Sequence, residues 1–194
     1  MYDLHPATRT LANLVVAVDD SQLDRPTPCP DYAVGDLLDH IGGLALAFAA
    51  AARKEDGTNA SPPRPGDRSQ LGGDWRTRIP RDLAALADAW VAPEAWDGMT
   101  KIAGMDMPAS VVGTVGLDEV VTHGWDLARA TGQVFEADEA AIAGSLEFAE
   151  SMSAPGAEAA RAPAFGPVVA VTEGATTLDR LVALTGRDPT WTMT

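Results

Sequence analysis

Residues 109–132 read ASVVGTVGLDEVVTHGWDLARATG, and this stretch decides the fold class that the sequence predicts. Its apolar residues recur at three- and four-residue steps, as on the buried face of an amphipathic helix: Leu117, Val120, Val121, Gly124 and Leu127. Gly132 then offers the left-handed backbone conformation in which many helices end. The pattern predicts one long helix over about 109–131.

Similar periodicity predicts further helices on both sides of this one, over about 6–20, 34–55, 80–91, 138–151 and 176–186. Aromatic residues make up only 6% of the chain, alanine is abundant and β-branched runs are short. This balance favours packed helices over a sandwich of sheets. The expected fold is therefore mainly α, a four-helix bundle with a long crossover and a short extended or helical C-terminal decoration.

Proline, glycine and small polar residues mark the connections. The segment 25–32, RPTPCPDY, holds three prolines, so no helix runs through it. Residues 56–76 have no hydrophobic period, which predicts a long surface crossover or a lid. An irregular or hairpin excursion is expected over 96–110, and a strand or extended segment over 165–171. The length of 194 residues suits one domain, so 1–194 is expected to form a single domain.

Composition narrows the possible partners. The chain has 14 Lys and Arg against 28 Asp and Glu, a formal net charge of −14, so its surface should repel nucleic acid and anionic lipid. Its one cysteine, Cys29, cannot form an internal disulfide, and the first residues lack the basic and apolar regions of a signal peptide. The apolar stretch 41–52 is shorter than the roughly 20 residues of a membrane span. We expect a cytoplasmic protein whose partners are small molecules.

The three histidines are the main candidates for chemistry. Glu119 and His123 are four residues apart on the helix predicted over 109–131, so both side chains can reach one metal ion. His40 flanks the apolar face of the helix over 34–55 and can complete a His-His-Glu set. Three protein ligands leave a coordination position open, as in catalytic sites. Gly113 and Gly116 on the same helix are expected to leave room for a ligand.

Each of these features also has a simpler interpretation. A Glu and a His four residues apart occur often on solvated helix faces. A histidine at the edge of an apolar face is often a hydrogen-bonded core residue. His5 precedes Pro6 at a helix start, where a capping or exposed role is expected, and it is left out of the site.

Three phrases of the sequence favour metal binding over these simpler interpretations. PTPCPDYAVGDLLDHIGG (26–43), GLDEVVTHGWDLARATGQ (116–133) and LVALTGRDPTW (181–191) resemble, in that order, segments of actinobacterial DinB-like proteins of the mycothiol-dependent maleylpyruvate isomerase group. The resemblance extends over about residues 5–194. It implies a DinB-like bundle in which His40, Glu119 and His123 bind a divalent metal ion, usually zinc. Tyr32 departs from the family, which often carries tryptophan at this position.

Supporting roles are open for a few neighbouring residues. Asp36 and Asp126 lie within one helical turn of the two candidate histidines and could orient their imidazoles, or could serve only as helix-dipole and surface charges. Arg129 could pair with a ligand carboxylate, or form a surface salt bridge. Cys29 could be a soft metal ligand or a reactive thiol, although free cysteine usually behaves as a small apolar side chain.

The resemblance implies a metal-dependent enzyme that activates a low-molecular-weight thiol, mycothiol, for S-transfer to a small electrophile or for its cis–trans isomerisation. The C-terminal part is short, and we expect it to lack a large second domain like that of the characterised isomerase, so maleylpyruvate does not follow as the substrate. Two imidazoles and a carboxylate also suit nickel, iron or manganese besides zinc. The alternatives are a non-catalytic metal- or small-molecule-binding module and a metal-free helical scaffold.

Overall fold

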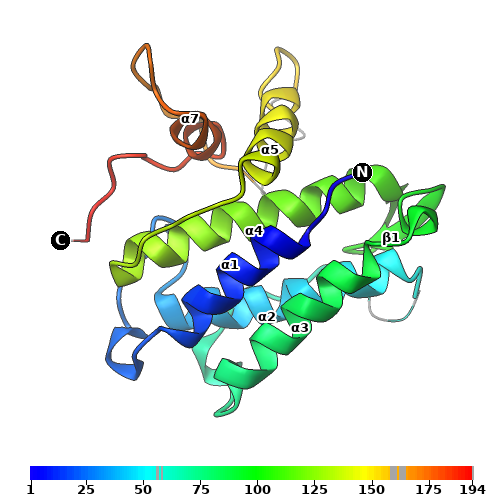
Figure 1. The fold of residues 1–194 in the computed structure, drawn as a ribbon, viewed down its shortest axis with the longest axis horizontal. Helices are drawn as coiled ribbons and strands as arrows, with labels where there is room; N and C mark the ends of the chain where they lie inside the picture. The colour runs from blue at the N-terminus through cyan, green and yellow to red at the C-terminus, as the bar shows by residue number, and fades with distance from the viewer. Residues whose placement is uncertain (56, 58, 158–160, 162–164, 194) are drawn as a thin grey trace.

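In the computed structural model the chain forms a bundle of helices with a smaller helical layer on one side (Figure 1). The structure describes residues 1–55, 57, 59–157, 161 and 165–193. Its helices are, in chain order, α1 (His5–Val16), α2 (Val34–Ala52), α3 (Trp75–Ala89), α4 (Ala109–Thr131), α5 (Glu139–Ser151) and α7 (Thr177–Leu184). The prediction of a mainly α fold is confirmed.

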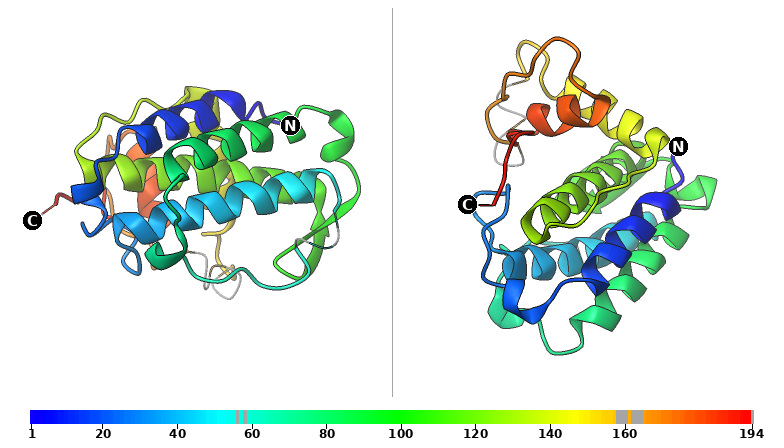
Figure 2. Two further views of the ribbon diagram at one scale, coloured as in Figure 1. Left: turned by 90° about the horizontal axis from the view of Figure 1, so that it is seen from below. Right: turned by 60° about the vertical axis from the view of Figure 1, so that its left-hand side comes forward.

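Helices α1 to α4 form the bundle. α1 packs against α3 and α4, and α2 packs against the same two helices, so the four helices enclose one apolar core. Residues that are fully buried in this core come from all four helices, among them Leu11, Leu38, Leu83 and Leu117. α5 and α7 contact each other, and α5 lies over α4 on the side away from the rest of the bundle (Figure 2). α4 is therefore covered on two sides.

The beginning of α3 differs from the prediction. The hydrophobic periodicity of the sequence predicted a start at about Pro80. In the structure α3 begins at Trp75, and Pro80 lies inside the helix. Trp75 and Ile79 are 3% and 0% exposed. Their burial offsets the hydrogen bond that proline cannot donate.

The connections follow the predicted types. The excursion over 96–110 contains an antiparallel hairpin of β1 (Met99–Ile102) and β2 (Met105–Pro108). Short 3₁₀ turns lie elsewhere, η1 (Asp20–Gln22), η2 (Arg68–Gln70) and η3 (Pro93–Ala95). The crossover passes along α2 and ends where α3 begins, and its residues 56 and 58 lie outside the described ones. Residues 166–172 form neither a helix nor a strand, and the Val169 amide donates to the carbonyl of Ala183 at 3.0 Å.

By length and composition, α2 would pass for a membrane span near the N-terminus, so the prediction that no apolar run is long enough was wrong. However, 72% of its apolar window is buried inside the structure. Its buried residues face α3 and α4. This burial is that of a core helix.

The glycines of α4 do not leave room for a ligand, contrary to the prediction. A Cβ on Gly113 would lie 2.6 Å from the Trp96 ring and 2.8 Å from the Trp90 ring. A Cβ on Gly116 would lie 3.0 Å from the ring of Phe48. These glycines instead let aromatic side chains pack directly against the helix backbone.

This packing predicts the effect of Gly113→Ala. The new methyl group must displace two tryptophan rings, which should cost about 1–3 kcal/mol and exceed the gain of about 1 kcal/mol in helix propensity. Urea denaturation should therefore show a less stable protein. Gly43→Ala on α2 is the matched control, because nothing lies within 4 Å of its Cβ and the same propensity gain should stabilise the protein. A Gly113→Ala protein as stable as the control would refute the packing argument.

Candidate metal centre

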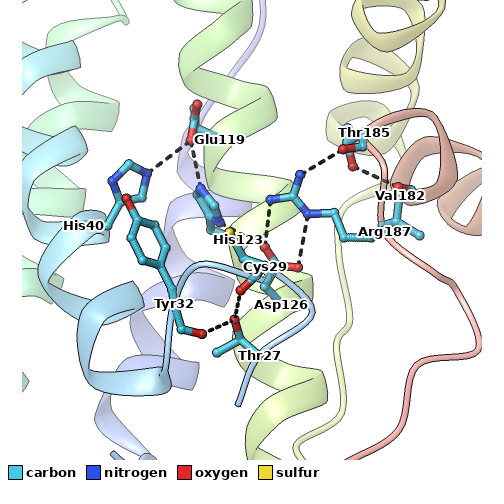
Figure 3. A network of polar contacts seen from close by, with 10 residues as sticks. All are labelled: Thr27, Cys29, Tyr32, His40, Glu119, His123, Asp126, Val182, Thr185 and Arg187. Carbon is cyan, nitrogen blue, oxygen red and sulfur yellow. Dashed lines mark hydrogen bonds and ion pairs between the residues drawn. The ribbon is translucent and has the colours of Figure 1, made fainter. Parts of the chain in front are cut away.

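Two of the three candidate donors come from one turn of α4. Glu119 and His123 face each other, with Glu119 Oε2 3.0 Å from His123 Nε2 (Figure 3). The spacing of four residues brings their side chains to the same face of the helix. The His123 side chain is only 7% exposed, whereas 29% of the Glu119 side chain is exposed. The pair therefore lies at the border between core and solvent.

The third donor comes from α2. His40 Nε2 lies 3.7 Å from Glu119 Oε2, and the rings of His40 and His123 meet edge to face with centroids 4.9 Å apart. The packing of α2 against α4 thus brings together residues that are distant in sequence. One donor atom from each of His40, Glu119 and His123 lies within 4.8 Å of the other two. The structure therefore places the three predicted residues in one cluster.

The loop that carries Tyr32 and the crossover after α2 both pack beside His40. The ring of Tyr32 is 5.2 Å from the His40 ring between centroids, and its hydroxyl oxygen accepts a hydrogen bond from the Gly66 amide at 3.1 Å. Asp39 holds the same crossover from α2, because its carboxylate accepts from both terminal nitrogens of Arg64 at 2.7 and 3.0 Å. The crossover predicted as a surface segment or lid is therefore attached to α2 next to the cluster.

A second polar layer lies behind His123. His123 Nδ1 is 3.0 Å from Asp126 Oδ2, and Asp126 is completely buried. Arg187, from the segment after α7, donates to both oxygens of Asp126, from Nε at 3.3 Å and from a terminal nitrogen at 3.0 Å. Because an ionised carboxylate only accepts hydrogen bonds, Nδ1 of His123 carries a proton. In neutral imidazole Nε2 then keeps a lone pair that faces Glu119.

The charges of the cluster shift its pKa values. Burial opposes ionisation of Glu119, but the imidazoles of His123 and His40 outweigh it and hold the pKa of this carboxyl well below its usual range. Burial also opposes charge on His123, yet Asp126 and Glu119 together raise its pKa to about 9. Burial and the charge of Glu119 raise the pKa of Asp118 to about 8. Asp118 is therefore mostly protonated at neutral pH and adds little negative charge.

The structure gives other partners to two of the residues proposed as supports. Asp36 accepts hydrogen bonds from the amides of Ala33 and Arg68 at 3.1 and 2.8 Å, so it caps α2 and holds the crossover instead of His40. Arg129 donates to the carbonyl oxygen of Trp191. Neither contact involves the cluster. Of the proposed supports, Asp126 is the one that contacts a candidate donor.

The remaining thiol and histidine lie outside the donor set. Cys29 is not one of the three clustered donors His40, Glu119 and His123. Burial raises the pKa of its thiol to about 11, and the charge of Asp126 contributes to this rise. A thiol with this pKa is a poor nucleophile at neutral pH. His5 lies apart from the cluster, with its ring nitrogens 2.8 Å from Asp3 and 3.0 Å from Asp88.

Comparison with known proteins places the fold and the sequence in one family. Residues 4–128 match the model of the mycothiol maleylpyruvate isomerase N-terminal domain. The chain belongs to this family. The matched range contains His40, Glu119, His123 and Asp126, whereas Arg187 lies beyond it. The resemblance to actinobacterial DinB-like proteins of this group is thereby confirmed, and the closing phrase over 181–191 lies beyond the matched range.

Its similarity to individual proteins is more distant. The chain is 29% identical over 150 residues to the uncharacterized proteins Rv0738 and MT0763 of two Mycobacterium tuberculosis strains, covering 77% of this chain and 76% of theirs. The crystal structure of the mycothiol-dependent maleylpyruvate isomerase matches with a TM-score of 0.59 at 19% identity, over 75% of this chain and 66% of that one. A histidine-to-alanine mutant of that isomerase gives 0.57. The chain thus spans slightly less than two thirds of the isomerase, and the likeness shows the fold.

Sequence reasoning did not find Arg187. The residue stands in the closing phrase LVALTGRDPTW, but no local pattern indicates that it reaches Asp126 on α4. The only signal available was the arginine itself in a phrase that resembles the family. Tyr32 was noted only as a departure from the family, and the structure shows that its hydroxyl oxygen accepts the hydrogen bond that holds the crossover beside His40.

Proposed function

We propose that this protein is a metal-dependent enzyme that activates a low-molecular-weight thiol, mycothiol, for reaction with a small electrophile. In this proposal His40, Glu119 and His123 hold one divalent metal ion, with zinc as the first candidate and nickel, iron or manganese as others. The reaction is S-transfer or cis–trans isomerisation. We place the protein in the cytoplasm, where low-molecular-weight thiols are kept reduced.

The main support for metal binding is the environment of one carboxylate oxygen of Glu119. Oε2 of Glu119 is buried and, within the described part of the chain, has no hydrogen-bond partner of good geometry, although His123 Nε2 lies 3.0 Å away. Because the pKa of His123 is raised to about 9, a proton occupies this space in the metal-free protein at neutral pH, and a divalent cation can take its place when the proton is released. Nε2 of His40 lies 3.7 Å from the same oxygen. These donors fit a divalent transition metal in number and in chemical type.

The surrounding residues hold these donors close to solvent. Asp126 fixes the proton of His123 on Nδ1, so that Nε2 can serve as a ligand. Tyr32 and the attached crossover form a wall on the side of His40. The His40 and Glu119 side chains are 22% and 29% exposed, so the cluster borders solvent although Oε2 of Glu119 itself is buried.

The chemistry follows from the thiol. A divalent metal ion bound here would favour thiolate over thiol and so supply a strong nucleophile at neutral pH. Addition of the sulfur to an activated C=C bond forms a C–S bond and leaves a carbanion. Protonation of the carbanion gives a conjugate, whereas rotation about the new single bond and expulsion of the same sulfur returns the isomerised alkene. Membership of the family supports mycothiol as the thiol and leaves the electrophile open.

The proposal predicts direct entry of a thiol into the coordination of the metal. With cobalt at the site, titration with mycothiol should add a sulfur-to-metal charge-transfer band, because thiolate is soft and easily oxidised. S-methylated mycothiol keeps the sugar and inositol groups but cannot form a thiolate, so it should give no band. The metal-loaded protein should also accelerate addition of mycothiol to a panel of electrophiles above the rate of mycothiol alone.

The controls separate this function from its rival. His5→Ala should behave like the wild type, because His5 contacts Asp3 and Asp88 away from the cluster. Metal binding without the band and without acceleration would reject the enzyme proposal and support a non-catalytic metal-binding module. Acceleration that persists after metal removal would place the thiol elsewhere.

A further inference from the structure

The segment after α7 contributes one buried side chain to the region behind the candidate donors. The Arg187 side chain is only 9% exposed, and it reaches α4 from a part of the chain beyond the family match at 4–128 (Figure 3). Its third guanidinium nitrogen donates to the carbonyl oxygen of Thr185 at 3.2 Å. All three nitrogens therefore have partners, and the orientation of the guanidinium is fixed.

Arg187 holds Asp126 at both carboxylate oxygens. A two-point contact between a planar guanidinium and a carboxylate prevents rotation of the carboxylate, which a single point charge would not do. Oδ2 of Asp126 is shared, because it lies 3.0 Å from Arg187 and 3.0 Å from His123 Nδ1. The direction from which Asp126 meets the imidazole is thus determined by Arg187.

We propose that Arg187 is a positioning residue, which fixes Asp126 and through it the ring orientation and tautomer of His123, so that Nε2 faces Glu119 and His40. The role of the cluster in metal binding rests on the proposed function, but the orientation of the ring can be measured without it. A chain of hydrogen bonds then joins the C-terminal layer to a donor on α4.

A purely structural role for Arg187 makes different predictions. Arg187 also neutralises the fully buried Asp126, and its loss would destabilise the protein even if the ring orientation had no importance. In that case the melting temperature would fall while the metal affinity of the folded protein and the tautomer of His123 stayed unchanged. The two roles are therefore separated by measurements at the ring and not by stability.

The chain offers a matched control. Arg129 also joins α4 to the C-terminal segment, through Trp191, but it contacts neither Asp126 nor the three donors. Arg129→Gln and Arg187→Gln each remove one arginine bridge between the same two parts of the chain. Only the second should affect His123.

The experiment measures cobalt affinity and the ¹⁵N spectrum of the imidazole rings in Arg187→Gln, Asp126→Asn, their double variant and Arg129→Gln. Asp126→Asn should weaken cobalt binding about 10–100-fold and Arg187→Gln about tenfold. The double variant should bind no more weakly than Asp126→Asn alone, because both changes break one chain of contacts. Arg129→Gln should stay within about twofold of the wild type, since changes at sites without shared partners act independently.

The ring spectrum gives the second readout, which needs neither metal nor thiol. The spectrum is recorded above the raised pKa of His123, about 9, where the ring is neutral. There the wild-type proton should sit on Nδ1, and in Arg187→Gln the ring should exchange between tautomers. If the wild type binds no metal, the proposed function fails, whereas a tautomer change in Arg187→Gln still supports positioning. Unchanged cobalt affinity together with an unchanged tautomer in folded Arg187→Gln would overturn the inference.

Arg187→Lys keeps the test decisive if the glutamine variant does not fold. Lysine retains the charge next to Asp126 but cannot contact both oxygens in the planar geometry of a guanidinium. Cobalt binding should therefore weaken several-fold, less than in Asp126→Asn. Wild-type affinity and a wild-type ring spectrum in Arg187→Lys would show that charge alone suffices and would reject positioning by the two-point contact.

Discussion

Alanine at His40, Glu119 or His123 should each weaken binding of zinc or cobalt more than about 100-fold, beyond the effect of residues that only support a ligand. Each change removes one of three donor atoms that lie within 4.8 Å of one another. Elemental analysis of wild-type protein prepared without chelator should find about one transition-metal ion per chain, because one such donor set is described. Dialysis against a metal-buffered solution measures the affinities.

His5→Ala is the control for these variants, because it removes a histidine that lies outside the cluster. It should bind metal like the wild type. If all four variants bind equally, the ion is held elsewhere and the assignment of the site is wrong. A wild type that stays metal-free at full metal availability would remove the basis of the metal-dependent function.

Trp90→Ala should lower the free energy of unfolding by about 3–5 kcal/mol, the range for large aromatic side chains in a core. Trp90 is 1% exposed, and its ring meets Trp96 at 4.9 Å between centroids. Its indole N–H also donates to the carbonyl oxygen of Phe48 at 3.1 Å. The substitution therefore leaves a cavity and removes a buried hydrogen bond, and both effects destabilise the folded state.

Urea denaturation followed by circular dichroism measures this loss. Val91→Ala is the neighbouring control, because Val91 is 61% exposed and its replacement should change stability by no more than about 0.5 kcal/mol. A loss below about 1 kcal/mol in Trp90→Ala, with the same slope of free energy against urea, would contradict the packing described between α2, α3 and α4.

The sequence predicted those parts of the fold whose signals are local. The bounds of α4 agree with the prediction because Gly132, with a φ of 75°, ends the helix by its own conformational preference. The start of α3 was missed because it depends on burial of Trp75 against other helices, which no local pattern reveals. The interpretation of Gly113 failed for the same reason, since the rings that fill the space come from residues before the helix. The single-domain assignment stays a prediction.

The candidate site was predictable to a similar extent. Glu119 and His123 could be paired from their spacing alone, because a helix places residues four apart on one face. His40 was joined to them from its place at the flank of an apolar helix face and from the family resemblance, but neither gives the tertiary contact between α2 and α4 that brings it to the pair. Arg187 could not be found at all, because its partner Asp126 belongs to a different helix. Metal binding by the cluster stays a prediction.

The distribution of the donors over two helices also determines the order in which the cluster can assemble during folding. Glu119 and His123 approach each other once a turn of α4 has formed, an event on the scale of about a microsecond or less. His40 arrives only when α2 packs against α4, which requires closure of a long loop and belongs to the slower cooperative step. A spectroscopic probe that senses His40 beside the pair would therefore follow the docking of the helices, whereas far-ultraviolet circular dichroism follows their growth.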